Sequence, residues 1–272
     1  MRHALAAVAL VAVATSAPAA EAIRVGEGDA ALNAVLYRPT GAGPFPAVVG
    51  LHDCRGMLNA SGQIVRRFAD WGERLSKQGI AILFVDSFTS RGLSSQCGVR
   101  ERKIRSSRER VADAYAARRW LQGQTWAMKN RVSLLGWSNG GAGSLWAVRP
   151  RVMPRDGMPD FRSAVAFYPS CRRLAASAWS ARIPTLILVG GADDWTPAGR
   201  CEQMVDGARG RSAQASIVVY PGAYHEFDRP DYPVRIITGL ANSADGSGRA
   251  HVGTNAAARA DAITRVTEWL RR

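Results

Sequence analysis

The pentapeptide Gly136-Trp137-Ser138-Asn139-Gly140 has the form G-x-S-x-G. At this chain's glycine and serine content about 0.2 chance matches are expected, so the pentapeptide alone is only suggestive. Its surroundings sharpen it, because an apolar run leads directly into it and a run of small residues that can open a helix follows. A strained strand-to-helix turn of this kind presents its serine as a nucleophile, with glycines where larger side chains would clash. We therefore expect Ser138 to be a nucleophile.

A serine hydroxyl reacts poorly near neutral pH, so Ser138 requires a histidine as general base and a carboxylate to orient that histidine. Where such a turn carries the serine, the acid and then the histidine follow it along the chain, which excludes the histidines before Ser138. His225 follows the apolar run at residues 216–220 across a short loop, whereas no such run precedes His251. We favour His225 as the base.

The acid is expected just after the strand that precedes the histidine strand. Residues 190–197 read GGADDWTP and directly follow an apolar run, so Asp193 and Asp194 compete for the role. Either aspartate could instead cap the helix that follows, since Asp is favoured at that position. The residues alone leave the choice open.

Acyl transfer also needs two backbone N–H groups directed at the oxygen on which negative charge develops, each worth roughly 2.7 to 4 kcal/mol in the transition state. One is expected from Asn139, the residue after the nucleophile. The other is expected from residues 52–56 (HDCRG), which follow the apolar run at residues 46–51. His52 in this loop is expected to be structural.

The elements that must position these residues follow from the apolar patterning. Near-continuous apolar runs predict strands at residues 32–37, 46–51, 80–85, 131–136, 164–168, 184–189 and 216–220. Helices are expected at residues 61–77, 100–123, 140–148, 199–208 and 256–270. Strands that alternate with helices indicate the α/β class, with a mainly parallel twisted sheet and helices on both faces. Residues 228–253 are expected to be a weakly structured insert.

The 272 residues include 36 Lys+Arg and 22 Asp+Glu, a formal net charge of +14. A hydrophobic content of 47% and scattered glycine and proline exclude disordered, coiled-coil and collagen-like chains. Basic residues are densest at residues 100–119, but acidic and apolar residues are interspersed, which favours a solvated helix face. No nucleic-acid-binding motif accompanies them, so we expect no nucleic acid partner.

Residues 1–22 have the features of a secretory signal peptide. A short basic start is followed by an apolar run of eleven residues and by small residues that allow cleavage after Ala19 or Ala22. The run is too short to remain a membrane anchor, which takes about 20 residues. We expect residues 23–272 to form one domain, periplasmic or secreted, without a membrane anchor after cleavage.

The four cysteines suit an oxidising compartment: Cys54, Cys97, Cys171 and Cys201. Four cysteines allow three connectivities, and spacing does not choose among them. A zinc site is the alternative, but the chain has no C-x-x-C pair. We expect disulfides, no metal and no organic cofactor.

Several motifs in order resemble the dienelactone hydrolase family of α/β-hydrolases, and more closely its exported branch. The likeness spans residues 35–270 and rests on HDCRG, DSF after a strand, GWSNGG, DDWTP and YPGAYHEFD. It implies the α/β-hydrolase fold. The family's Gly-x-x-Asp pattern, with a proline four residues after the acid, selects Asp193 over Asp194. The family's second oxyanion donor falls on the amide of Cys54.

The resemblance carries three further implications. The family's sheet order pairs neighbouring loops, which implies disulfides Cys54–Cys97 and Cys171–Cys201. Its substrate-carboxylate arginine, four residues after the histidine, matches Arg229, and Trp137 beside the nucleophile is a second candidate for substrate contact. The founding enzymes carry a cysteine nucleophile where this chain has Ser138, so an ordinary serine esterase mechanism is expected.

Together these features predict an exported serine hydrolase that cleaves small-molecule carboxylic esters or lactones through Ser138, His225 and Asp193 and an acyl-enzyme intermediate. A peptidase or a depolymerase of polymer esters could use the same three residues. A non-catalytic cationic binding protein that retains a relic site is the alternative from another class.

Overall fold

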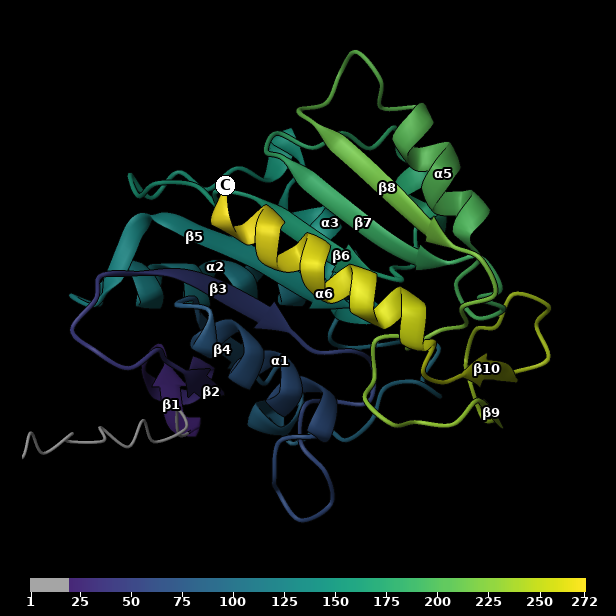
Figure 1. Cartoon of the computed structure of the whole chain (residues 1–272), viewed down its shortest axis with the longest axis horizontal. Helices are drawn as coiled ribbons and strands as arrows, with labels where there is room; N and C mark the ends of the chain where they lie inside the picture. Colours follow the sequence, from purple (N-terminus) through teal and green to yellow (C-terminus); the bar gives the residue numbers. More distant parts are fainter. Residues whose placement is uncertain (1–19) are drawn as a thin grey trace, which may run out of the picture.

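The computed structural model describes residues 20–272, so most of the expected signal peptide lies outside the described residues. Its centre is an eight-stranded sheet in the order β1-β2-β4-β3-β5-β6-β7-β8 (Figure 1). The strands are β1 (Ala20–Val25), β2 (Leu32–Tyr37), β3 (Phe45–Leu51), β4 (Ala81–Val85), β5 (Ala127–Trp137), β6 (Ala164–Phe167), β7 (Thr185–Gly190) and β8 (Ala215–Tyr220). The pairs β1–β2 and β2–β4 are antiparallel and the other five are parallel, which confirms the predicted mainly parallel sheet.

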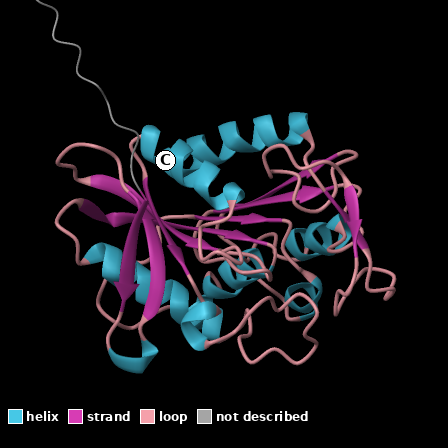
Figure 2. Ribbon diagram, turned by 90° about the horizontal axis from the view of Figure 1, so that it is seen from below, coloured by secondary structure: helices cyan, strands magenta, loops and turns pink. Residues whose placement is uncertain are grey.

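Helices cover both faces of the sheet, as predicted (Figure 2). They are α1 (Arg66–Lys77), α2 (Glu109–Gln122), α3 (Asn139–Ala147), α4 (Arg172–Ala176), α5 (Ala198–Asp206) and α6 (Ala256–Arg271), with short 3-10 helices at Gly28–Ala30, Thr89–Arg91 and Pro150–Val152. The apolar residues of α1 and α6 share one buried cluster, and those of α2, α3, α4 and α5 share another. The sheet therefore separates two cores.

The strands have apolar residues at successive positions because both of their faces are buried. In β3, Val48 faces the core of α1 and α6, whereas Val49 faces the core of α2 and α3. In β4, Phe84 faces the core of α1 and α6, and Leu83 faces the core of α2 and α3. Alternate side chains of a strand point to opposite faces, so two covered faces require an unbroken apolar run.

Two helices begin later than the sequence pattern predicts. Residues 61–65 belong to a turn in which the Val65 N–H donates to the Met57 carbonyl (2.9 Å), so α1 starts at residue 66. Residues 100–108 are a loop, in which the Arg102 side chain donates to the carbonyls of Gln96 (2.8 Å) and Val99 (3.2 Å). The prediction of a helix from residue 100 is therefore wrong.

Three strands were not expected. Strand β1 pairs along its whole length with β2, from Ala20 opposite Tyr37 to Val25 opposite Leu32. The insert at residues 228–253 contains an antiparallel pair, β9 (Arg235–Ile237) and β10 (Ala250–Val252) (Figure 1). The expectation of a weakly structured insert is corrected by this pair. In the described residues no helix combines the length and apolarity needed to cross a membrane.

The structure contains two disulfides, and they are the two pairs that the resemblance implies. Cys54 bonds to Cys97, 43 residues along the chain, and Cys171 bonds to Cys201, 30 residues along the chain. Cys171 directly precedes α4 and Cys201 lies in α5, so the second bond joins these two helices.

We expect removal of the second disulfide to destabilise the fold without moving the candidate site. The double variant Cys171→Ala/Cys201→Ala frees a loop of 30 residues in the unfolded chain, which lowers the free energy of unfolding by about 3 to 4 kcal/mol. Urea denaturation of the oxidised protein measures the change. An unfolding midpoint equal to that of the wild type would contradict it.

Candidate active site

Ser138 lies at the turn between β5 and α3, at the edge of the sheet where the parallel strands end. Its backbone angles are φ 52° and ψ −111°, a region that residues other than glycine rarely occupy. The Ser138 N–H donates to the Phe167 carbonyl in β6 (2.9 Å), and the Ala142 N–H donates to the Ser138 carbonyl (2.8 Å). These bonds hold the serine in the strained conformation that the motif predicts.

The two glycines of the motif stand where no side chain fits. A Cβ built on Gly136 would overlap the carbonyl of Gly140, and a Cβ built on Gly140 would overlap the carbonyl of Leu51 at the end of β3. The nucleophile turn and the start of the candidate oxyanion loop are therefore in direct backbone contact.

The structure brings together three of the residues that the sequence singles out. His225 Nε2 lies 3.0 Å from Ser138 Oγ, and His225 Nδ1 lies 2.7 Å from Asp193 Oδ2. The other carboxylate oxygen of Asp193 accepts the N–H groups of Trp195 (2.9 Å) and Thr196 (2.8 Å), which fix the acid. A proton on Nδ1 bonded to Asp193 leaves Nε2 free to accept the serine proton.

Aromatic rings hold the imidazole of His225 on two sides. The ring centroid of Tyr168 lies 4.4 Å from that of His225, and the ring centroid of Trp195 lies 4.5 Å from it. The His225 side chain is fully buried. Close packing of this kind restricts the imidazole to one rotamer and strengthens its hydrogen bonds by excluding water.

The two residues that competed for these positions pair with one another. The Nδ1 of His251 lies 2.7 Å from Asp194 Oδ2, and the His251 N–H donates to Asp194 Oδ1 (2.8 Å). Both side chains are partly exposed, 37% for His251 and 43% for Asp194. The geometry therefore separates one buried Asp–His pair that reaches Ser138 from one exposed pair.

The two expected oxyanion donors lie on different elements. Asn139 is the first residue of α3, and Cys54 follows β3. In the described chain neither backbone N–H donates to a backbone carbonyl, so both are available to a ligand. The loop itself is pinned, because the Cys54 carbonyl accepts the Gln96 N–H (2.7 Å) and Cys54 is bonded to Cys97.

His52 is fully buried and has structural partners. Its Nδ1 lies 2.7 Å from the Asp53 carbonyl, and its Nε2 accepts the Ser87 N–H (3.1 Å). Burial and the adjacent Arg110 guanidinium lower the pKa of His52 well below its usual value, so the ring is neutral. Arg110 also donates to the His52 carbonyl (2.5 Å), which holds the main chain at the start of this loop.

The two candidates for substrate contact differ in exposure. Trp137 is completely buried and donates its indole N–H to Asp228 (2.8 Å), so no face of the ring is open to a substrate and the expectation is wrong for this residue. The Arg229 side chain is 24% exposed, pairs with Glu226 (2.8 Å) and stacks on the Tyr232 ring at 3.5 Å.

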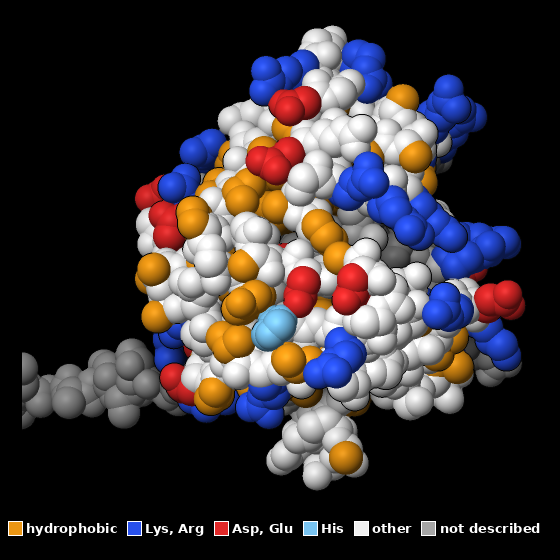
Figure 3. Space-filling model, turned by 90° about the vertical axis from the view of Figure 1, so that its right-hand side faces the viewer, with side chains coloured by type: hydrophobic (Ala, Val, Ile, Leu, Met, Phe, Trp, Pro, Cys, Tyr) orange, Lys and Arg blue, Asp and Glu red, His pale blue; other side chains and the backbone are white. Residues whose placement is uncertain are grey.

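Figure 3 views the side of the molecule toward which β7 and β8 point in Figure 1, and shows Lys and Arg gathered along its upper and right margins. Part of the charge is neutralised locally, since Arg105 and Arg108 both pair with Glu109 (3.4 and 3.6 Å). Among residues 20–272, no group of three His, Cys, Asp or Glu side chains is placed to hold a metal ion.

Sequence reasoning missed a set of buried charged side chains next to the site: Arg67, Glu226 and Asp228. A signal for Arg67 is present in the sequence, because it lies four residues before Trp71 and eight before Leu75, on the apolar stripe of its helix. Glu226 and Asp228 flank Phe227 directly after His225 and carry no such pattern.

The family model for the dienelactone hydrolase family matches residues 32–272. This chain belongs to the dienelactone hydrolase family. Membership makes it a hydrolase, and the fold is the α/β-hydrolase fold of that family. No protein with a curated description matches the sequence.

Solved structures of family members share the fold. A putative dienelactone hydrolase from Klebsiella pneumoniae is 19% identical, with a TM-score of 0.67 over 94% of this chain and 100% of that one. A dienelactone hydrolase-like promiscuous phosphotriesterase, P91 from metagenomic libraries, is 20% identical, with a TM-score of 0.68 over 94% and 98% of the two chains. Dipeptidyl peptidase 4 from Porphyromonas gingivalis is 15% identical, with a TM-score of 0.65. That match covers 94% of this chain but 35% of the peptidase.

We expect Gly140→Ala to lower the stability of the protein strongly. The added Cβ meets the Leu51 carbonyl, which is backbone and cannot turn aside, so the free energy of unfolding should fall by about 3 kcal/mol. Gly199→Ala in α5 is the matched control, because nothing lies within 4 Å of its added Cβ and alanine favours a helix. Thermal denaturation compares them, and equal melting temperatures would contradict the prediction.

Proposed function

We propose that the chain is an exported serine hydrolase that cleaves carboxylic esters or lactones through an acyl-enzyme intermediate. The observation that carries the proposal is the continuous series from Asp193 through His225 to Ser138, with contacts of 2.7 and 3.0 Å, on a strained nucleophile turn. Family membership supports hydrolysis, and two available amides beside Ser138 support acyl transfer.

Acylation begins when Ser138 Oγ attacks the ester carbonyl carbon and its proton passes to His225 Nε2. The former carbonyl oxygen becomes an oxyanion and accepts the backbone N–H groups of Cys54 and Asn139, while Asp193 stabilises the imidazolium. The carbon–oxygen bond to the alcohol then breaks, and His225 gives its proton to the leaving oxygen.

Deacylation repeats these steps with water. His225 takes a proton from water as the water oxygen attacks the acyl carbon, and the second tetrahedral intermediate collapses with return of the proton to Ser138 Oγ. With a lactone the alcohol remains joined to the acyl group, so one hydroxy acid is released in this step.

Export is supported by two features of the chain. The first 22 residues have the composition of a signal peptide, and both disulfides suit an oxidising compartment. Strand β1 favours one of the two cleavage points, because cleavage after Ala22 would remove half of the β1–β2 pairing and cleavage after Ala19 would leave all of it.

We expect substitutions in the Asp193–His225 pair to remove most of the esterase activity and substitutions in the Asp194–His251 pair to have little effect on it. Ser138→Ala and His225→Ala should each lower kcat for p-nitrophenyl acetate by about 10⁶-fold and Asp193→Asn by about 10⁴-fold, the cost of such changes in serine proteases. Asp194→Asn and His251→Ala are the matched controls and should retain kcat within about threefold, as the exposed pair does not reach Ser138.

Three results would overturn parts of this proposal. Wild-type hydrolysis by Ser138→Ala would remove the nucleophile assignment. Faster cleavage of matched acyl-amides than of esters would make the chain a peptidase. A wild-type protein that neither hydrolyses esters nor reacts with a fluorophosphonate probe would favour a binding protein with a relic site.

We expect the exported protein to begin at Ala20. Expression of the full chain with secretion, followed by N-terminal sequencing or intact mass measurement, identifies the first residue. A mature protein that begins at Ile23 would show that three of the six β1 residues are dispensable, and a retained Met1 in the cytoplasmic fraction would overturn export.

A further inference from the structure

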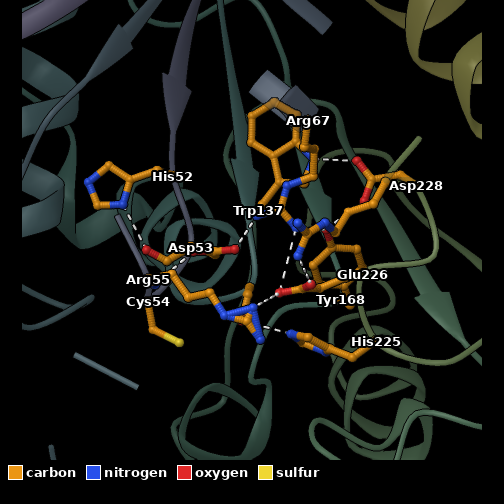
Figure 4. A network of polar contacts seen from close by, with 12 residues as sticks. His52, Asp53, Cys54, Arg55, Arg67, Trp137, Tyr168, His225, Glu226 and Asp228 are labelled. Atoms are coloured by element: carbon orange, nitrogen blue, oxygen red, sulfur yellow. Dashed lines mark hydrogen bonds and ion pairs between the residues drawn. The ribbon is translucent and has the colours of Figure 1, made fainter. Parts of the chain in front are cut away.

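Ionisable side chains lie buried beside the candidate active site, and the proposed reaction uses none of them (Figure 4). Asp53, Arg67, Glu226 and Asp228 are each at most 4% exposed. Charges removed from water are costly unless they are paired and hydrogen-bonded. Asp53, Arg67 and Glu226 take part in ion pairs, and Asp228 accepts hydrogen bonds from Trp71, Trp137 and Tyr168. These contacts fix the segments that carry the four side chains.

The cluster adjoins the site along the chain at three points. Each of three cluster residues is the direct sequence neighbour of a residue in the proposed reaction, in the pairs Asp53 and Cys54, Trp137 and Ser138, and Glu226 and His225. Trp137 belongs to the cluster because its indole N–H donates to Asp228 Oδ2 (2.8 Å). The contacts of these three residues therefore bear on the backbone positions of Cys54, Ser138 and His225.

Arg67 on α1 lies at the centre of the cluster. Its guanidinium forms an ion pair with Asp53, donates to the Tyr168 hydroxyl (3.0 Å) and lies 3.8 Å from Glu226 Oε1. The Tyr168 hydroxyl in turn donates to Asp228 Oδ1 (2.6 Å). One side chain thus connects the loop after β3 that carries Asp53 and Cys54 (the oxyanion loop), the end of β6 and the loop after β8 that carries His225 and Glu226 (the histidine loop).

Asp53 and Arg67 are held in their charged forms. Burial raises the pKa of Asp53, but the charges of Arg67 and Arg55 outweigh burial and lower it below the usual range. Burial lowers the pKa of Arg67, but Tyr168 and the carboxylates of Asp53 and Glu226 outweigh it, so the guanidinium stays protonated. The contact between Arg67 and Asp53 is therefore ionic near neutral pH.

We propose that Arg67 is a positioning residue that holds the Cys54 amide in place relative to His225 and Ser138. It acts through Asp53 on the Cys54 side and through Glu226 and Tyr168 on the His225 side. The inference rests on the proposed function. Arg67 is 4% exposed and its two terminal nitrogens donate to Tyr168 and Asp53, while its Nε is buried without a partner, so it acts through these neighbours and not on the substrate.

The physical reason is the geometric demand of oxyanion stabilisation. The Cys54 loop follows β3 and the His225 loop follows β8, which lie in different parts of the sheet. Arg55 joins the two loops directly by donating to Glu226 Oε1 (3.1 Å) from a partly exposed side chain, and Arg67 adds a second connection that is buried. A displacement of about 1 Å in a catalytic group can cost about 100-fold in rate. A planar guanidinium that bonds two loops at fixed angles holds both in one arrangement, which a flexible ammonium would not do.

The test compares Arg67→Met with Arg66→Met, its neighbour on the same helix. Arg66 is the matched control because its side chain is 71% exposed and pairs with Asp231 at the surface. We expect Arg67→Met to lower kcat for p-nitrophenyl acetate about 100-fold with KM within about twofold, and Arg66→Met to change neither. Asp53→Asn, which keeps the side-chain shape, should give a similar loss of kcat and carries the test if Arg67→Met does not fold.

Two further readouts separate positioning from general destabilisation. A trifluoromethyl ketone forms a hemiketal, in which Ser138 Oγ bonds to the ketone carbon, the serine proton passes to His225 and the ketone oxygen becomes an oxyanion. Its affinity should fall by the same factor as kcat/KM. The double variant Arg67→Met/Asp53→Asn should lose no more activity than Arg67→Met, because the two residues act through one contact.

The outcomes distinguish this inference from the proposed function. Active wild-type protein together with folded Arg67→Met and Asp53→Asn variants that keep kcat and ketone affinity would overturn the inference alone. Losses that multiply in the double variant would also overturn it, since independent destabilisation predicts them. Wild-type protein that is inert to ester and fluorophosphonate would overturn both proposals.

Discussion

The arrangement of the site depends on the backbone contact between the nucleophile turn and the end of β3. Gly140 approaches the Leu51 carbonyl so closely that no Cβ fits, and Gly136 approaches Gly140 in the same way. This approach forces Ser138 into its positive φ and brings the loop after Leu51 beside the first turn of α3. The two proposed oxyanion donors belong to these two elements, and the glycines let the elements touch.

Arginine supports this contact from both sides of the oxyanion loop. Arg110 donates to the His52 carbonyl and Arg67 pairs with the Asp53 carboxylate, and both guanidinium groups are buried. The chain has three lysines among 36 basic residues, and the planar five-donor guanidinium suits such fixed, buried contacts better than an ammonium does. Part of the net charge of +14 is therefore structural, and the rest is a solvated arginine-rich surface.

The sequence predicts the sheet well because each parallel strand is buried on both faces and is therefore an unbroken apolar run. It predicts helix starts poorly. Residues 61–65 and 100–108 have apolar residues at helical spacing, but their backbones form turns and loops that are held by other hydrogen bonds. Strand β1 escaped prediction because its residues adjoin the expected signal peptide. The choice of Asp193 over Asp194 required the resemblance, since adjacent residues differ only in the directions of their side chains.

The insert at residues 228–253 explains why the histidine loop is ordered. The Gly253 N–H donates to the His225 carbonyl (3.1 Å), and the Asn255 N–H donates to the Phe227 carbonyl (3.1 Å). Backbone groups that are buried without partners are costly, so the return of the chain after β10 satisfies the segment that carries the proposed base. The same insert bonds to the disulfide loop, because the Ala241 N–H donates to the Cys97 carbonyl (2.9 Å). The insert is therefore attached both to the segment that carries His225 and to the loop that carries Cys97, which is bonded to Cys54. It links the proposed base to the proposed oxyanion donor by a route that does not pass through Arg67.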